Sequence, residues 1–297
     1  MKKCVIITTI NDYINTSIPQ LITHLKDYYI IIVGDNKTPH HSYNKTHIIY
    51  LYNTNILSNL PKNHYCQKNI GYIYAIQNDY DEILETDDDN YLYPEWEKYK
   101  NNKVSKINSP KLPNILSFFD NPNIWLRGYP LQYVKKEQKL EIENIHLNDN
   151  VAIIQSLIDN DPDVDAICRM TNHSYNTDIV FSKENTIIYE KNVYGQGNTQ
   201  GTLWLNKKIF YLLYLPSTVS FRFCDILKMY IAQKCIWYHN LNFAVISPIF
   251  YQKRNEHNYM NDFISEYEMY KNILLIIDNI FEEIKLNGNI YDLITIL

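Results

Sequence analysis

Several short apolar runs in the first third of the chain show no alternation between apolar and polar side chains. They cover residues 3–9, 29–33, 47–51 and 82–84. Strands that are buried on both faces show this pattern, and such strands form parallel sheets covered by helices. A segment with helical spacing, residues 68–76, lies between the third and fourth runs. We therefore predict an α/β fold with a mixed, mostly parallel, doubly wound sheet, in which ligands bind beyond the carboxyl ends of the strands.

The rest of the chain is expected to complete one domain and to add a helix. Residues 91–139 carry five prolines and few periodic segments, which favours long loops over a site. Further along, we predict a short helix over residues 151–158, a strand over residues 165–170 and a long amphipathic helix over residues 263–286. A chain of 297 residues can bury the core of one large domain. We therefore place the main domain at residues 1–253 and a helical extension packed on it at residues 254–297.

Charge and cysteine content narrow the class of protein. The formal net charge of −5 and the pI near 6.0 give no general affinity for polyanions, so nucleic acid is not expected as a partner. Five cysteines occur without a C-x-x-C pair, as expected for buried thiols in a reducing compartment. The apolar run near the N-terminus is too short for a signal peptide, and no stretch approaches the length of a membrane span. We therefore expect a soluble protein of the cytoplasm. The many Asn, Ile, Lys and Tyr residues indicate an AT-rich genome. If that genome is viral, the protein would belong to the host cytoplasm or the virion.

An acidic run, residues 85–90, directly follows the strand expected over residues 82–84. Its three successive carboxylates, Asp87, Asp88 and Asp89, repel one another and need a cation or strong hydrogen-bond donors nearby. Carboxylate oxygens suit Mg²⁺ or Mn²⁺, and such an ion can hold a nucleoside diphosphate and stabilise the charge that develops as it leaves. A solvated turn is the alternative. The preceding strand and the neighbouring loops favour a metal site, with Asp87 and Asp89 as ligands and Asp88 beside the nucleotide.

The placement of these carboxylates resembles that in the GT-A glycosyltransferases, where an Asp-x-Asp metal motif follows a helix and a strand as Asp87-Asp88-Asp89 does here. More narrowly, the chain resembles the STELLO-type family of glycosyltransferases. The segments that carry this resemblance run in order along most of the chain: residues 33–39, 68–76, 125–131, 162–166 and 215–216, and the helix around Asp225. Two of them, residues 162–166 and the Asp225 helix, are also similar to the reversibly glycosylated polypeptides, which act as UDP-arabinopyranose mutases.

This resemblance implies a GT-A-like, Rossmann-like fold and a metal-dependent enzyme that transfers a sugar from a nucleotide-sugar. The donor would be a UDP-sugar, the cofactor Mn²⁺ or Mg²⁺, and the acceptor a glycan or another hydroxyl compound. A UDP-sugar mutase of the reversibly glycosylated polypeptide type and a catalytically inert scaffold with the same fold are the alternatives. Whether the chain forms a homodimer is left open.

Residues at strand ends and at one helix start are candidates for binding the nucleotide donor. Thr8 and Thr9 end the first strand, where the GT-A pattern holds the base and ribose, although they would equally cap the following helix. Asp35 could accept a hydrogen bond from uracil or ribose and Lys37 could neutralise phosphate, unless both belong to a simple surface turn. Lys68, at a helix start, could meet an anion. Further donor-side candidates are Tyr72, Asn69, which could equally be a local helix cap, and Arg127, which could bind phosphate or an acceptor sugar.

The remaining candidates concern the acceptor and the metal. Asp163 and Asp165 flank Val164 at the expected start of a strand and could serve the acceptor hydroxyl from one side, although an Asx-type turn explains them equally. Asp225 lies in the first turn of a helix, where the helix dipole alone favours a carboxylate, and its position in the resemblance makes it the candidate general base or acceptor contact. His257 could complete the metal shell as a neutral imidazole.

Overall fold

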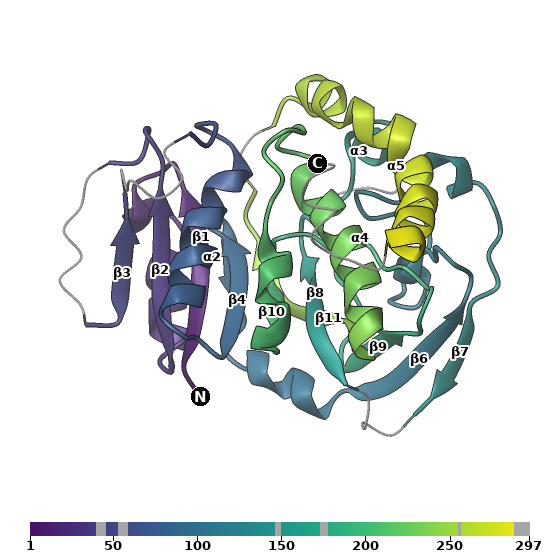
Figure 1. Cartoon of the computed structure of the whole chain (residues 1–297), viewed down its shortest axis with the longest axis horizontal. Coiled ribbons are helices and arrows are strands. Elements are labelled where there is room, and N and C mark those ends of the chain that lie inside the picture. Colours follow the sequence, from purple (N-terminus) through teal and green to yellow (C-terminus); the bar gives the residue numbers. More distant parts are fainter. Residues whose placement is uncertain (40–45, 53–58, 146–149, 173–177, 255–256, 288–297) are drawn as a thin grey trace.

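The computed structural model describes residues 1–39, 46–52, 59–145, 150–172, 178–254 and 257–287. These residues form one sheet of eleven strands with helices packed against it (Figure 1). The strand order is β3-β2-β1-β4-β10-β8-β11-β9-β6-β7, and β5 pairs with β11. The predicted α/β fold, a mixed sheet flanked by helices, is confirmed.

The strands have these bounds in chain order: β1 Lys3–Thr9, β2 Tyr28–Gly34, β3 Ile48–Leu51, β4 Glu82–Asp87, β5 Asn90–Leu92, β6 Lys103–Ser109, β7 Glu141–Asn144, β8 Val151–Asp159, β9 Asn185–Tyr189, β10 Thr202–Trp204 and β11 Asn242–Gln252. The α-helices are α1 Ile18–His24, α2 Lys68–Gln77, α3 Ala166–Thr171, α4 Cys224–Ile236 and α5 Tyr259–Asn287. Short 3-10 helices are η1 Tyr13–Asn15, η2 Tyr65–Gln67, η3 Trp96–Asn101, η4 Ile115–Ser117, η5 Leu131–Tyr133, η6 Lys207–Leu213 and η7 Trp237–His239.

The strands at one end of the sheet, β3, β2, β1 and β4, are parallel, as predicted. β1 lies between β2 and β4, and its residue Thr8 is opposite Val33 on one side and Asp87 on the other. β3 extends this parallel group beyond β2. Further along the sheet, β10 is antiparallel to both β4 and β8, and β11 is parallel to β8. The carboxyl ends of β1, β2 and β4 therefore meet at one edge of the sheet, where the acidic run begins.

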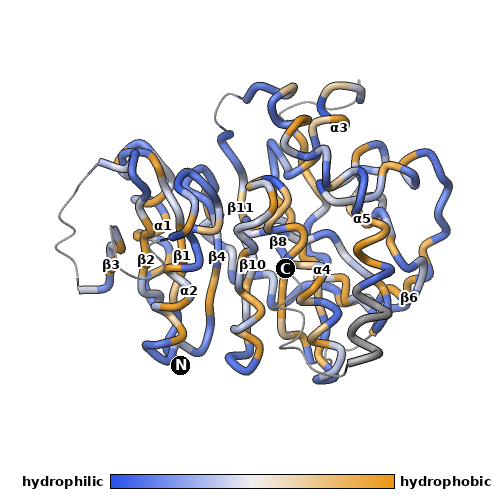
Figure 2. The backbone as a smooth tube through the Cα atoms, turned by 45° about the horizontal axis from the view of Figure 1, so that its top comes forward, coloured by the Kyte–Doolittle hydropathy of each residue, from blue (hydrophilic) through white to orange (hydrophobic). Residues whose placement is uncertain are grey.

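Both faces of the parallel group are buried. Ile6 packs into one hydrophobic cluster with Ile70 of α2, whereas its neighbour Val5 packs into a second cluster with Ile18 and Leu21 of α1. Successive side chains of a strand point to opposite faces, so each strand serves both clusters. α4 and α5 contribute to the first cluster further along the sheet, and Figure 2 shows apolar segments along the strands and α4. The non-alternating runs are therefore strands buried on two sides, as the sequence indicates.

Two predicted elements are of the wrong type. Residues 151–158, predicted as a helix, form β8, because this apolar segment fills a central position of the sheet between β10 and β11. Residues 165–170, predicted as a strand, lie instead at the start and within α3. The Asp165 side chain accepts a hydrogen bond from the Cys168 backbone N–H and caps this helix, a local signal that outweighs the strand pattern.

The predicted long helix near the C-terminus is present as α5, which contacts α3 and α4. Met269, Ile273 and Ile277 lie on its buried side within the first hydrophobic cluster. The division of the chain between residues 253 and 254 stays a prediction. None of the helices that the structure describes has both the length and the hydropathy needed to span a membrane. The five cysteines are buried free thiols, as expected.

Candidate active site

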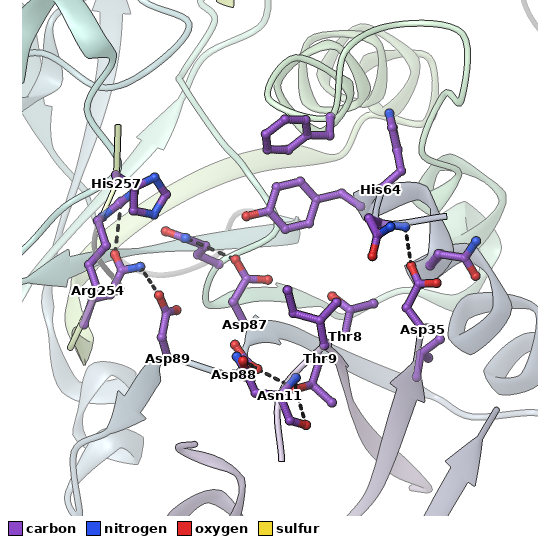
Figure 3. Close-up of a pocket in the computed structure, with 18 residues that line it drawn as sticks. Thr8, Thr9, Asn11, Asp35, His64, Asp87, Asp88, Asp89, Arg254 and His257 are labelled. Carbon is purple, nitrogen blue, oxygen red and sulfur yellow. Dashed lines mark hydrogen bonds between the residues drawn. The ribbon is translucent and has the colours of Figure 1, made fainter. Parts of the chain in front are cut away.

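A cavity of about 270 Å³ lies at the carboxyl ends of β1, β2 and β4 (Figure 3). Thr8 and Thr9 of β1, Asp35 after β2 and residues 87–89 at the end of β4 line it. This is the edge of the sheet at which the sequence predicts a ligand site. The other lining residues come from the ends of β1 and β2, the approach to α2, the loops before β10 and α4, and the end of β11: Ile10, Asn11, Val33, Asn63, His64, Tyr65, Gln67, Gln200, Phe221, Gln252, Arg254 and His257.

Asp87, the last residue of β4, has a hydrogen-bond donor on each carboxylate oxygen. The Lys68 ammonium lies 2.9 Å from Oδ1, and the Gln200 side-chain amide donates to Oδ2 at 3.1 Å. Lys68 is completely buried and also donates to the Thr86 carbonyl at 2.9 Å. A buried ammonium and a buried carboxylate each supply the counter-charge that the other needs. The charge of Asp87 is therefore balanced within the protein, and Lys68 stands behind the cavity wall.

Asp88 ties the turn after β4 to the end of β1. Its Oδ2 accepts hydrogen bonds from the Thr9 hydroxyl at 2.5 Å and from the Asn11 side-chain amide at 3.0 Å. The Asp88 backbone carbonyl accepts from the Ser17 N–H at 2.7 Å. Burial raises the pKa of the Asp88 carboxyl. These contacts hold the two loops together at the edge of the cavity.

Asp89 has one satisfied and one unsatisfied carboxylate oxygen. Oδ2 accepts from the Gln252 side-chain amide at 2.8 Å, whereas Oδ1 is buried and has no hydrogen-bond partner among the described residues. Burial, together with the charge of Asp87, raises the pKa of Asp89 to about 7. A buried oxygen without a partner is costly for the fold. A cation bound at this atom would remove that cost, so Asp89 fits the chemistry of a metal ligand.

His257 lies on the Asp89 side of the cavity, away from Asp35 (Figure 3). Its Nδ1 atom is 3.1 Å from a carboxylate oxygen of Asp262. The part of the chain that the structure describes holds no group of three or more His, Cys, Asp or Glu side chains arranged to bind a metal ion. Asp87, Asp89 and His257 thus line one cavity without forming a complete ligand set. A metal ion held there would take further ligands from a bound substrate, as Mg²⁺ does at phosphate sites.

Asp35 lies at the opposite end of the cavity and is held by backbone donors. Its carboxylate accepts from two backbone N–H groups, at 2.7 and 2.6 Å. The Thr38 hydroxyl accepts from the Asp35 N–H at 2.8 Å and donates to the Thr9 carbonyl at 2.6 Å, which joins the ends of β1 and β2. Because an ionised carboxylate has more than two acceptor positions, Asp35 can still bind a ligand donor. Lys37, predicted to meet phosphate from the same turn, is exposed and lies outside the described lining of the cavity.

Two donor-side candidates on α2 have partners inside the protein. Asn69 exchanges two hydrogen bonds of 2.8 Å with the backbone of Leu215. Tyr72 donates to Glu85, whose carboxylate also lies 2.8 Å from the buried Lys228 ammonium. Glu85 belongs to the acidic run in the sequence, but its carboxylate is in the core with these partners. The described lining of the cavity includes neither Asn69 nor Tyr72.

Arg127 and two acceptor-side candidates form a buried ion cluster. The Arg127 guanidinium lies 2.9 Å from the Asp163 carboxylate and 2.8 Å from that of Asp225, and all three side chains are at most 5% exposed. Asn198 also donates to Asp163, at 2.7 Å. Although burial opposes ionisation, Arg127 holds the pKa of Asp163 below its usual range. The structure therefore places Arg127, Asp163 and Asp225 with one another and outside the described lining of the cavity.

Asp165 is likewise occupied inside the protein. Its carboxylate accepts from the Cys168 N–H and from the Trp125 indole, both at 2.7 Å. Burial raises the pKa of Asp165 to about 7. The predicted strand would place Asp163 and Asp165 on one side for an acceptor. Because a helix begins after Asp165 instead, the two carboxylates face different partners.

Several lining residues are not identifiable from the sequence. Gln200 and Gln252 donate to two carboxylates of the acidic run. Arg254 donates to Gln252 at 3.2 Å and pairs with Asp161 at 3.0 Å. These residues belong to no motif and are far from the run in the chain. The pairing of β11 with β5 places Gln252 opposite Asn90, so only the sheet topology reveals its role.

Comparison with solved structures gives low similarity over nearly the whole chain. Glucosyl-3-phosphoglycerate synthase from Mycobacterium tuberculosis, solved with Mn²⁺ and UDP-glucose, aligns with 94% of this chain and 78% of its own, at 6% identity and a TM-score of 0.45. TarS of S. aureus aligns with 93% of this chain and 39% of its own, at 13% identity and a TM-score of 0.36. No family model matches the chain.

Two curated relatives are similar to most of the chain. Probable glycosyltransferase STELLO1 of Arabidopsis thaliana is 23% identical over 267 residues, which cover 82% of this chain and 34% of that protein. Probable glycosyltransferase STELLO2 of the same plant is 23% identical over 252 residues, which cover 76% of this chain and 33% of that protein. The chain thus spans about a third of the length of these relatives. These matches confirm the resemblance of the chain to the STELLO-type glycosyltransferase family.

Proposed function

We propose that this chain is a metal-dependent glycosyltransferase that binds a UDP-sugar and transfers its sugar to a hydroxyl acceptor. The observation that carries the proposal is the Asp89 carboxylate, which lines the cavity and has one buried oxygen without a partner among the described residues. Mn²⁺ or Mg²⁺ prefers such oxygen ligands and completes its shell with phosphate oxygens. The similarity to proteins named probable glycosyltransferases supports the same activity.

In the proposed complex, Asp89 and His257 hold the metal ion and Asp87 lies beside it. The sequence favours Asp87 and Asp89 equally, but both oxygens of Asp87 have donors in the structure. Lys68, which pairs with Asp87 from behind the cavity wall, holds the Asp87 side chain in place. When bound, the ion would hold the diphosphate and stabilise its charge as the sugar leaves. Arg254 lies on the same side, and although it pairs with Asp161, its remaining guanidinium N–H groups suit phosphate oxygens.

The other end of the cavity suits the nucleoside. Asp35 can accept a hydrogen bond from a ribose hydroxyl or from the uracil N–H. Thr8 and Thr9 line the cavity between Asp35 and the acidic turn. Tyr65 and Phe221 contribute two aromatic rings with centroids 6.0 Å apart, against which a planar base or a sugar ring can pack. A nucleoside diphosphate would thus extend from Asp35 to the acidic turn.

The acceptor would bind around the mouth of the cavity. The three predicted acceptor-side carboxylates, Asp163, Asp165 and Asp225, are buried and already have donors. To contact an acceptor directly, these carboxylates would have to break the hydrogen bonds with those donors and leave the buried donors unpaired. We therefore assign these carboxylates to the support of the site, and the acceptor to other groups.

The proposal is tested by unfolding experiments with UDP and UDP-sugars, with and without Mn²⁺. A ligand at about 100 times its Kd stabilises the folded state by about 2.7 kcal/mol. We expect a gain in stability that requires both nucleotide and metal and that disappears in EDTA. If UDP and every UDP-sugar tested gave no Mn²⁺-dependent gain, the donor site would be refuted.

Donor-turnover assays then separate the possible activities. A transferase releases UDP from its donor, slowly to water and faster when the acceptor is present. A UDP-sugar mutase converts the ring form of UDP-arabinose without an acceptor and releases no UDP. An inert scaffold binds the nucleotide and turns over nothing. Release of UDP that depends on Mn²⁺ and on Asp89 is the result expected here.

A further inference from the structure

Asp262, in the first turn of α5, contacts the histidine that lines the cavity. Its Oδ2 lies 3.1 Å from Nδ1 of His257. An ionised carboxylate can only accept a hydrogen bond, so Nδ1 carries the proton in this contact. In a neutral imidazole the lone pair is then on Nε2, which is the atom left to bind a metal ion.

Asp262 is itself held by buried partners. The Arg222 guanidinium lies 3.6 Å from the other carboxylate oxygen of Asp262 and donates to Glu266 at 2.6 Å. Glu266 is one helical turn beyond Asp262, so both acids face the same side of α5. Its second oxygen accepts from the Ala166 N–H at 2.9 Å. With exposures of 7% for Asp262 and 0% for Glu266, this support is inside the protein.

Arg222 and the first turns of α5 also hold the loop that carries Phe221, another lining residue of the cavity. Phe221, which lines the cavity, directly precedes Arg222. The neighbouring Ser220 hydroxyl donates to the Ser265 carbonyl of α5 at 2.5 Å. The Arg222 carbonyl accepts from Arg127, so the loop is also joined to the buried ion cluster. The first turns of α5 therefore do more than cover the domain, because they hold residues that face the ligand.

We infer that Asp262 is a positioning residue of the metal site, which keeps His257 in the Nδ1–H tautomer and turns its Nε2 toward the ion. This inference rests on the proposed function, because it needs the ion that Asp89 and His257 would share. Removing a carboxylate that orients a metal-binding histidine typically weakens metal binding by about 10- to 100-fold. An Asp262 that only stabilised the fold would leave the metal affinity of the folded protein unchanged.

The first test compares Mn²⁺ binding by the wild type, Asp262→Ala and Asp278→Ala at saturating UDP, using calorimetry. Asp278 is the matched control, since it lies on the same helix but pairs with Lys111 at the surface. We expect about 10- to 100-fold weaker binding for Asp262→Ala and no change for Asp278→Ala. Adding Asp262→Ala to His257→Gln should cause no further loss, because Asp262 acts through His257.

The second test reads the tautomer directly by NMR of ¹⁵N-labelled histidines. Among the nine histidines of the chain, the His257 signals are those lost in His257→Gln. The wild type should show the proton on Nδ1, and Asp262→Ala should shift the ring toward the Nε2–H form. Because the wild-type spectrum is informative alone, this test does not depend on the folding of Asp262→Ala.

The outcomes separate the two levels of the proposal. Equal Mn²⁺ affinity of the wild type and Asp262→Ala, or an Nε2–H ring in the wild type, would overturn the role of Asp262 and leave the proposed function standing. A wild-type protein that binds no Mn²⁺ at saturating UDP would overturn both.

Discussion

Replacing Asp89 by asparagine should affect the free protein and its metal binding in opposite directions. In the free protein, the Asp89 carboxylate is buried beside Asp87, and its pKa is raised from 3.8 to about 7. A carboxyl whose pKa is raised by folding makes the fold less stable as the pH rises from about 4 to about 7. At about 1.36 kcal/mol per pH unit, its ionisation at pH 8 costs the fold at most roughly 4 kcal/mol. Asparagine carries no charge and keeps an acceptor for Gln252. We therefore expect the free energy of unfolding to rise by about 1–4 kcal/mol.

Urea unfolding at pH 8 in EDTA measures the first effect, and the same titration with UDP and Mn²⁺ measures the second. Asp89→Asn should gain stability in EDTA and lose the Mn²⁺-dependent gain. Asp88→Asn is the matched control, because Asp88 belongs to the same turn but accepts from Thr9 and Asn11. Burial also raises the pKa of Asp88, so that control should gain stability at pH 8 as well, less the loss from weaker hydrogen bonds with Thr9 and Asn11, and it should keep its response to Mn²⁺. An Asp89→Asn protein that is less stable than the wild type in EDTA, or that still responds to Mn²⁺, would refute the reasoning.

Three further variants test the surroundings of the site. Burial raises the pKa of Asp165 to about 7. The free energy of unfolding of Asp165→Asn should therefore fall less steeply than that of the wild type between about pH 4 and about pH 7. Binding of UDP and Mn²⁺ should stay unchanged. Lys68→Met should lower the free energy of unfolding by about 3–5 kcal/mol because Asp87 loses its counter-charge, and adding Asp87→Asn should restore part of it in urea titrations. Gly71→Ala should lower the free energy of unfolding by about 1–3 kcal/mol, because the added Cβ would lie 2.6 Å from a methyl group of Ile6. An unchanged midpoint of urea unfolding would contradict this and show that α2 can move away from Ile6.

The parallel end of the sheet could be predicted because each of its strands carries its own signal. β1 and β2 are seven-residue strands whose side chains are almost all buried, so their apolar runs are visible without knowledge of their neighbours. β5 and β10 have only three residues each, which is too short for a periodic pattern. Their positions depend on pairing with β11, β4 and β8, which a local pattern cannot contain.

The candidate site was predictable where its residues are consecutive. Residues 87–89 lie at the end of a strand, and in any fold three successive carboxylates need a bound ligand or hydrogen-bond donors nearby. Gln252 could not be recognised, because its role is to donate a hydrogen bond to Asp89, which is 163 positions away in the sequence. The sequence also cannot separate a charge that meets a ligand from a charge that meets a buried partner. Arg127 and Asp225 show this, since they are 98 positions apart and form one ion pair.

Whether a charged residue contacts a ligand or a buried partner decides how loss of activity in its variants should be interpreted. Asp225 shares the Arg127 guanidinium with Asp163, and all three are buried, so removing Asp225 leaves buried guanidinium N–H groups without their acceptor. Leaving buried donors without an acceptor typically costs about 1–3 kcal/mol each, and Arg127 also holds the loop that carries Phe221 into the cavity. An inactive Asp225 variant would therefore not identify a catalytic base. Asp89 is different, because it lines the cavity and one of its buried oxygens has no partner among the described residues, so loss of Mn²⁺ binding in an Asp89 variant is most simply explained by loss of a metal ligand.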